Sequence, residues 1–125
     1  MSGSVRLNVR FVADNDERRA MGLMHAAPLA ENEAALFVFP RTGCHAFWNK
    51  NVSFPLSLAF LDENRRIVHT ADMKAGSTES CAPPTDNVRF VVEASQGTWA
   101  RLGVTAGDFV DYHDNALHVM RQKRL

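Results

Sequence analysis

The chain has 125 residues, of which 46% are hydrophobic and 22% are charged. This length and composition predict one soluble globular domain over residues 1–125 and exclude an intrinsically disordered chain. The 14 basic and 14 acidic side chains balance, so no net charge attracts a nucleic acid, and no apolar run reaches the roughly 18 residues of a membrane-spanning helix.

The first third of the chain predicts a strand, a short helix and a second strand. Apolar and polar residues alternate over residues 5–11, which is the pattern of a half-buried strand. The acidic cluster at 14–17 can cap a helix, which we expect over residues 16–24. The apolar run 35–39 predicts a buried strand that ends at Pro40.

A hairpin and a long loop are expected next. The turn residues 62–64 join the apolar run 54–61 to the segment 66–70, which favours an antiparallel hairpin. Residues 74–87 are rich in Gly, Ser, Thr and Pro, and a loop of this length in a small domain is more often a lid or binding element than a connector. The remaining expected elements are strands at 88–93, 109–112 and 117–120 and a helical turn at 98–102.

Short strands at close spacing with one or two short helices indicate a mostly β fold, either a small antiparallel sandwich or a partly closed barrel. The alternation within these strands predicts which apolar side chains face the core. They are Val5, Leu7, Val9, Leu36, Val38, Phe60, Ile67, Phe90 and Val92.

Cellular location and thiol state depend on where the natural chain begins. The N-terminus lacks the layout of a signal peptide, so a complete chain is expected in the cytoplasm with Cys44 and Cys81 as free thiols. If an N-terminal segment was trimmed, an exported or membrane-anchored protein is expected instead. A disulfide between the two cysteines is then more favoured.

Seven short motifs follow one another along most of the chain. They are Arg19-Ala20-Met21-Gly22-Leu23-Met24, Leu36-Phe37-Val38-Phe39, Phe47-Trp48-Asn49-Lys50-Asn51, Pro55-Leu56, Val91-Val92-Glu93, Gly97 and Gly107-Asp108. Their order and spacing resemble the domain-of-unknown-function 192 family. The resemblance implies a compact β-rich fold and prokaryotic relatives, several with export signals or membrane anchors, and it implies no settled activity.

The chain departs from the family's usual pattern at three places. Asn49 stands where the family usually has Met, Val52 where it has Thr, and His25-Ala26 where an Arg is usual. A function that relies on those side chains is therefore not expected to transfer to this chain.

The stretch 47–51 combines two aromatic rings, a cation and two amides, which together can bind a polar ligand by stacking, hydrogen bonds and charge. In a strand, Trp48 and Lys50 share one face and the other three residues share the opposite face. Trp48 and Lys50 are therefore the better pair for a ligand. The alternative is that Phe47 or Trp48 packs in the core while Lys50 pairs with a nearby carboxylate.

Arg19, on the short expected helix, is a second candidate because a guanidinium can hold a carboxylate or phosphate through two parallel hydrogen bonds. The alternative is a structural fork that ties the helix to loop carbonyls. The candidate ligand-binding residues are Arg19, Trp48, Lys50 and Asn51.

Catalytic and metal-binding patterns are weak. No two of the five histidines have the His-x-x-x-His spacing of a helical metal site, and Cys44-His45 is a poor chelate because adjacent strand residues face apart. A Cys44 or Cys81 nucleophile would need a histidine beside it in space. We therefore predict no metal, no cofactor and no catalytic residue, and we leave the question of enzymatic activity open while leaning against it.

The sequence thus favours a non-catalytic module that binds a small polar or anionic ligand. The alternatives are a protein-interaction or assembly module and, less favoured, a small hydrolase or thiol-dependent enzyme. An aromatic-lined cleft containing Trp48 and Lys50 would favour the first, a broad apolar patch the second and a Cys–His contact the third. The oligomeric state is not predicted.

Overall fold

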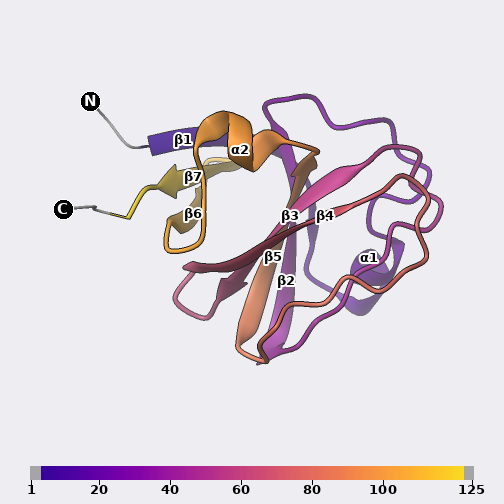
Figure 1. The fold of residues 1–125 in the computed structure, drawn as a ribbon, viewed down its shortest axis with the longest axis horizontal. Helices are drawn as coiled ribbons and strands as arrows, with labels where there is room; N and C mark the ends of the chain where they lie inside the picture. Colours follow the sequence, from indigo (N-terminus) through magenta and orange to yellow (C-terminus); the bar gives the residue numbers. More distant parts are fainter. Residues whose placement is uncertain (1–3, 123–125) are drawn as a thin grey trace.

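The computed structural model describes residues 4–122, so both ends of the predicted 1–125 domain lie outside it. Within these residues, seven strands form one sheet in the order β4-β3-β5-β2-β1-β7-β6, and two short helices flank it (Figure 1). The strands are β1 (Ser4–Ala13), β2 (Glu33–Gly43), β3 (Leu56–Asp62), β4 (Ile67–Met73), β5 (Val88–Ser95), β6 (Phe109–His113) and β7 (Ala116–Met120), and the helices are α1 (Asp16–Met21) and α2 (Thr98–Leu102).

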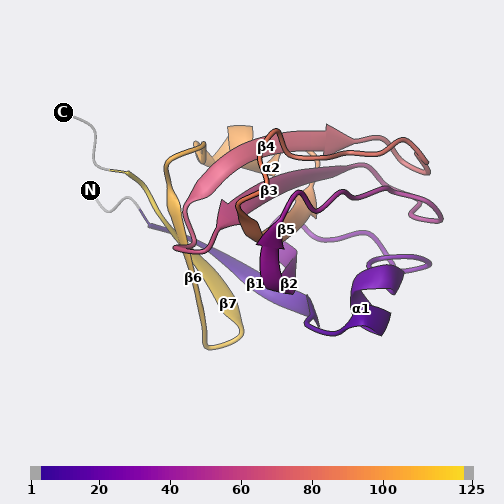
Figure 2. The same cartoon turned by 90° about the horizontal axis from the view of Figure 1, so that it is seen from below.

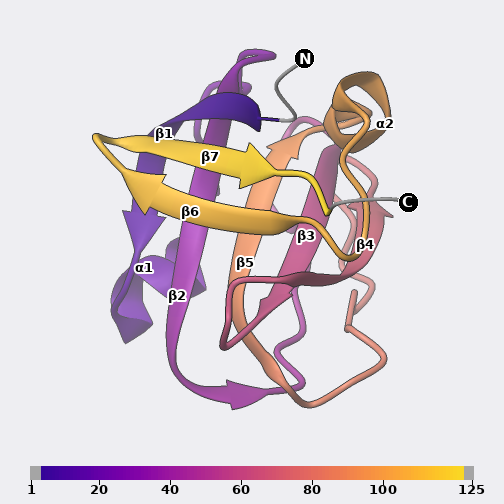
Figure 3. The ribbon, with the colours of Figure 1, turned by 90° about the vertical axis from the view of Figure 1, so that its left-hand side faces the viewer.

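Strand β1 changes its partner halfway along its length. Its first half pairs with β7 in antiparallel fashion, and its second half pairs with β2 in parallel fashion. The register with β2 shifts between Val9 and Phe11, and a bulge of this kind bends a strand. The bend carries the β6–β7 hairpin across one face of the central strands (Figure 3).

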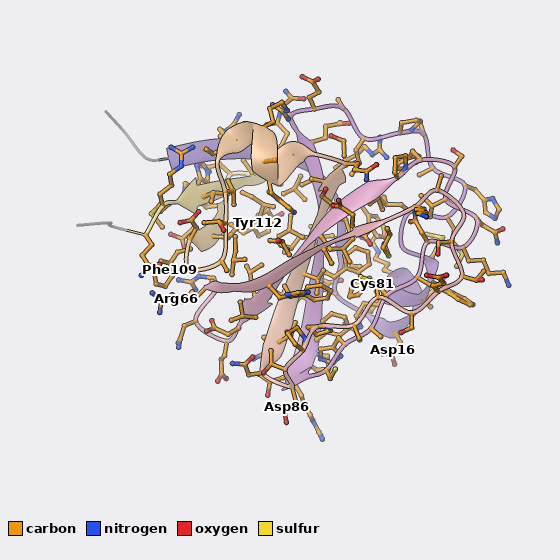
Figure 4. The ribbon with its side chains drawn as sticks, in the orientation of Figure 1. Asp16, Arg66, Cys81, Asp86, Phe109 and Tyr112 are labelled. Atoms are coloured by element: carbon orange, nitrogen blue, oxygen red, sulfur yellow. The ribbon has the colours of Figure 1, made fainter. Side chains whose placement is uncertain are left out.

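The two edge strands, β4 and β6, meet at one end of the sheet. The Ile67 amide donates to the Asp108 carbonyl at 2.8 Å, and the Gly107 amide donates to the Ile67 carbonyl at 2.8 Å. Arg66 and Phe109 form a β-bridge at the same place and lie next to each other in Figure 4. The sheet is therefore a partly closed half-barrel, which confirms the predicted mostly β fold and selects the barrel over the sandwich.

Apolar side chains are buried on both faces of the central strands β2, β3 and β5. One cluster lies inside the curl of the sheet with Trp99 of α2, and the other lies beneath α1 and the irregular segments (Figure 2). Each of the nine predicted core residues is buried or packs against a buried cluster. The core prediction is thus confirmed.

Two predicted element boundaries were wrong. The helix ends at Met21 instead of Met24, because Gly22 leaves helical geometry with φ +51° while its amide still caps the last turn. Strand β2 continues through Pro40 to Gly43. Pro40 is tolerated because it lies where the register with β5 shifts, so no ladder hydrogen bond from its nitrogen is needed.

The other local predictions agree with the structure. Strands β3 and β4 form the expected antiparallel hairpin, and Thr98–Leu102 is helical. Residues 74–87 contain no helix or strand and join β4 directly to β5. This long irregular connection lies on the α1 side of the sheet (Figure 1).

Replacing Phe60 by Ala should lower the free energy of unfolding by about 3–5 kcal/mol, since its ring is 0% exposed and its removal leaves a cavity. Phe90→Ala is the matched control, because Phe90 is only partly buried, and it should cost less. Urea denaturation of the two variants measures the difference. Equal losses would contradict the assignment of Phe60 to the better-packed position.

Candidate functional site

A pocket of about 370 Å³ lies on the α1 side of the sheet. Its walls come from α1 and the turn that follows it, from residues 46–50 and Val52, and from Thr78 and Ser80 of the long loop. The sheet contributes Phe37 and Phe39 of β2 and Glu93 of β5. This volume lies in the range of pockets that hold small molecules.

The two irregular segments that border the pocket hold each other in place. Phe47 and Cys81 exchange two backbone hydrogen bonds, at 2.8 and 2.7 Å, and the Asn49 amide donates to the Ser77 carbonyl at 2.8 Å. Backbone groups in buried loops need such partners. The long loop is therefore fastened to residues 47–49, on the same side of the molecule as α1 (Figure 4).

Residues 47–51 do not form a strand, which is the arrangement for which the alternation of faces was considered. The segment is irregular, with an isolated bridge at Phe47, and it turns where the Val52 amide donates to the Asn49 carbonyl at 3.1 Å. Because the chain turns, the alternation of faces expected for a strand does not apply. Residues 47–50 all border the same pocket.

Trp48 and Lys50 lie together at this pocket. The Trp48 side chain is 48% exposed, and the Lys50 Nζ lies 5.2 Å from the centre of its ring, within cation–π distance. Lys50 makes no ion pair within residues 4–122, so the alternative in which it pairs with a local carboxylate does not describe this structure. Phe47 packs edge-on against Phe37 at 5.0 Å, as the core-packing alternative expected.

Arg19 also borders the pocket, but its guanidinium is already engaged. One Nη donates to the Val38 carbonyl at 2.7 Å, and the other pairs with Asp16 at 2.7 Å. The group also lies 5.5 Å from the centre of the Phe39 ring. These contacts are those of a structural fork that ties α1 to β2.

Asn51, the fourth sequence candidate, does not line the pocket. Its side chain is exposed, its φ is +61°, and its carbonyl accepts a hydrogen bond from the His25 amide at 2.9 Å. Asparagine tolerates this left-handed conformation better than most residues. Asn51 therefore shapes the turn that presents Trp48 and Lys50.

Asn49 is a pocket residue that the sequence analysis did not choose. It is 1% exposed, and its Nδ2 donates to the carbonyls of Phe54 at 2.9 Å and Lys74 at 3.0 Å. Its buried Oδ1 has no hydrogen-bond partner in the part of the chain that the structure describes. Asn49 thus leaves one acceptor unsatisfied beside the pocket.

Glu93 is the second pocket residue that the sequence analysis did not choose. It lies in the middle of β5 between Ala35 of β2 and Leu58 of β3, is 4% exposed and lines the pocket. Its carboxyl makes no hydrogen bond or ion pair among residues 4–122. Burial raises the pKa of Glu93 to about 8, so the carboxyl is mostly protonated at neutral pH.

The environment of Cys81 does not favour a reactive thiolate. Burial raises the pKa of the Cys81 thiol, and the negative charges of Glu93 and Asp72 raise it further. Both cysteines are free thiols, and Cys44 donates to the Pro83 carbonyl at 3.3 Å. Among the described residues, no hydrogen bond joins a cysteine to a histidine.

A family profile matches most of the chain. The profile of DUF192, described as Uncharacterized ACR, matches residues 2–112. The chain belongs to the DUF192 family. A comparison of this DUF192 chain with curated proteins found no match.

Two solved structures resemble this DUF192 protein. A protein of unknown function from Novosphingobium aromaticivorans DSM 12444 is 26% identical, with a TM-score of 0.78 over 83% of this chain and 75% of that one. A protein of Sinorhizobium meliloti 1021, described as a proposed transcription regulator, is 28% identical, with a TM-score of 0.76 over 85% of this chain and 89% of that one. The half-barrel is thus similar to folds already solved.

Two further features of the DUF192 chain concern membranes and metals. Within residues 4–122, neither helix has the length and apolar character needed to span a membrane. In the same range, no three side chains of His, Cys, Asp or Glu are grouped so that they could hold a metal ion.

The buried carboxyl predicts an unusual pH dependence of stability. The pKa of Glu93 rises from its ordinary 4.5 to about 8 on folding, so the folded protein keeps a proton that the unfolded chain releases between these values. The contribution of this proton to the free energy of unfolding is fully present below about pH 4.5. It is lost as the pH rises toward about 8, at roughly 1.4 kcal/mol per pH unit.

Glu93→Gln, which is neutral at every pH, should remove this decline. Urea denaturation of both proteins between about pH 5 and 8 measures it, and the difference between the two curves isolates Glu93 from other titrating groups. Parallel curves would contradict the burial of an unpaired carboxyl at this position.

Proposed function

We propose that this DUF192 protein is a non-catalytic module that binds a small polar or anionic ligand in the pocket beside α1. The observation that carries the proposal is the placement of Trp48 and Lys50 together at a pocket of about 370 Å³. An exposed aromatic face supplies contact area, and a cation with no ion-pair partner among residues 4–122 supplies charge.

Lys50 is the group that selects an anion. The positive charge of Arg19 is balanced by Asp16 at 2.7 Å, whereas the Lys50 ammonium extends over the Trp48 ring. A ligand that places a carboxylate or phosphate at Lys50 and a flat or apolar body on Trp48 satisfies both groups at once.

The distribution of exposed apolar side chains supports a pocket ligand over an assembly surface. Met21 and Trp48 are exposed and border the pocket, whereas Tyr112 and Met120 are exposed on the β6–β7 hairpin. The hairpin lies on the opposite side of the central strands from α1 (Figure 2). These residues do not form one broad apolar patch, which an assembly module would present.

The chemistry of the thiols supports binding over a thiol-dependent reaction. A nucleophilic cysteine needs a lowered pKa and a neighbouring base. Burial and two nearby carboxyl groups raise the pKa of Cys81, and Cys44 donates to a backbone carbonyl.

The proposal is tested with caproate, benzoate and inorganic phosphate as probes. Trp48 fluorescence and thermal shift measure binding to the unmodified protein and to Lys50→Ala, and thermal shift alone measures binding to Trp48→Ala, which lacks the fluorescent ring. Trp99 is buried, so its emission is expected to stay constant. Lys50→Ala and Trp48→Ala should each weaken binding of the best probe about tenfold, or roughly 1.4 kcal/mol, with nearly unchanged melting temperature.

Tyr112→Ala is the matched control, because Tyr112 is equally an exposed aromatic residue but lies on the far hairpin. It should leave binding unchanged. Failure of every probe to bind, unfolding of Trp48→Ala, or an equal loss in the Tyr112 variant would each count against the proposed function.

A further inference from the structure

Two buried polar groups with unused hydrogen-bonding capacity border the same pocket. Glu93 and Asn49 are 4% and 1% exposed, and both line it. The Glu93 carboxyl makes no hydrogen bond, and the Asn49 Oδ1 has no partner, within residues 4–122. The two Nδ2 hydrogen bonds of Asn49 fix its amide so that the oxygen remains the unsatisfied atom.

Such groups are normally satisfied, because an unpaired buried polar group loses its hydration without replacement. The Asn49 Oδ1 is an acceptor without a donor, and the Glu93 carboxyl lacks a partner within residues 4–122 in either protonation state. A ligand group that reaches Glu93 through the pocket would supply the partner that this carboxyl lacks.

The cations of the pocket do not fill this role. Arg19 pairs with Asp16 and the Val38 carbonyl, and Lys50 lies over Trp48. Neither cation forms an ion pair or hydrogen bond with Glu93 within residues 4–122. The carboxyl thus has no positive partner in the described part of the chain.

The other titratable groups near Glu93 do not form an ion pair with it within residues 4–122. The charges of Glu93 and Asp72 raise the pKa of the Cys81 thiol, but Asp72 lies in the same row as Ser57 and Ala94, on the opposite face of the sheet from Glu93. His69 of β4 lies on the same face of the sheet, two residues from Ala71, and its ring is 5.8 Å from that of Phe60. The remaining neighbours on β2 and β3 are apolar.

The walls of the pocket are suited to a cationic group. Phe37, Phe39, Phe47 and Trp48 all line it, and aromatic faces attract ammonium groups, more strongly where water is excluded. A hydroxyl group could donate to Glu93 as well, but it would gain neither the ion pair nor the cation–π attraction.

We propose that the Glu93 side of the pocket binds a protonated amine and that the ligand is a small zwitterion, whose ammonium group pairs with Glu93 while its anionic group is held by Lys50. The Lys50 half of this statement rests on the proposed function. The Glu93 half adds the chemical class of the ligand.

Binding of an ammonium group changes the protonation of Glu93. In the empty pocket at neutral pH the carboxyl is mostly neutral; with the ammonium beside it the carboxylate is favoured, so its proton passes to solvent and the ligand keeps its own. Nearly one proton is therefore released per ligand at neutral pH. Above the pKa of Glu93 the carboxyl is already ionised, and no release is expected.

The experiment uses ligands matched in length, namely ε-aminocaproate, ε-hydroxycaproate and caproate, with γ-aminobutyrate and butyrate as a shorter pair. Calorimetry in buffers of different ionisation enthalpy gives affinity and proton release together. The amino compound that fits better should bind at least about tenfold more tightly than its hydroxy and unsubstituted analogues. Its affinity should rise with pH up to about 8, whereas that of caproate should not.

Two variants separate the halves of the pocket. Glu93→Gln should abolish the advantage of the amino group and the proton release while leaving caproate binding intact, and Lys50→Ala should weaken caproate and ε-aminocaproate alike. If Glu93→Gln does not fold, the pH dependence and proton release of the unmodified protein decide the question.

The outcomes distinguish the two proposals. If caproate or butyrate binds and is weakened by Lys50→Ala, but the amino group adds neither affinity nor proton release, the ammonium proposal is overturned and the proposed function stands. Equal binding of ε-hydroxycaproate and ε-aminocaproate overturns it as well. If the amino compounds bind through Glu93 while Lys50→Ala changes nothing, the anionic half and the proposed function fail instead.

Discussion

The backbone hydrogen bonds between Ile67 and the Gly107–Asp108 turn close the curled sheet. They join the two edge strands at one end and hold the sheet in a half-barrel. Asp108 supports this junction, since its buried carboxylate accepts hydrogen bonds from the amides of Thr105 and Gln122 at 2.9 and 2.8 Å. Because the curl folds β1, β6 and β7 over one face of the central strands, the opposite face must be covered by something other than strands.

That cover consists of α1 and the two irregular segments, and the pocket is its consequence. The space left between them reaches the sheet at Glu93, where the chain places a carboxyl among apolar neighbours. Burying a group of this kind without a partner costs stability, so its position beside a pocket is better explained by what enters the pocket than by the fold.

Local sequence patterns predicted the parts of the fold that depend on local chemistry. Alternation located β1, the turn residues after β3 located the β3–β4 hairpin, and the run of Gly, Ser, Thr and Pro marked the long loop. Trp48, Lys50 and Arg19 were recognised as residue types suited to binding, and all three border the pocket.

What the sequence did not reveal depends on contacts between distant segments. The strand order and the closure between β4 and β6 are set by pairing across the sheet, and the path of β2 through Pro40 depends on a register shift with β5. The turn that brings Trp48 and Lys50 to one side is fixed by hydrogen bonds to the long loop. Glu93 was visible as the only acidic residue of the expected strand 88–93, but its burial depends on what covers that face.

The central claim is that the Glu93 carboxyl is buried at the pocket without a partner among residues 4–122. Carbon-13 NMR of protein labelled at the glutamate side-chain carboxyls measures this directly, with the Glu93 signal assigned from its absence in Glu93→Gln. The account predicts a titration midpoint of about 8 for Glu93 in the empty protein. A midpoint near the ordinary value of 4.5 would contradict it.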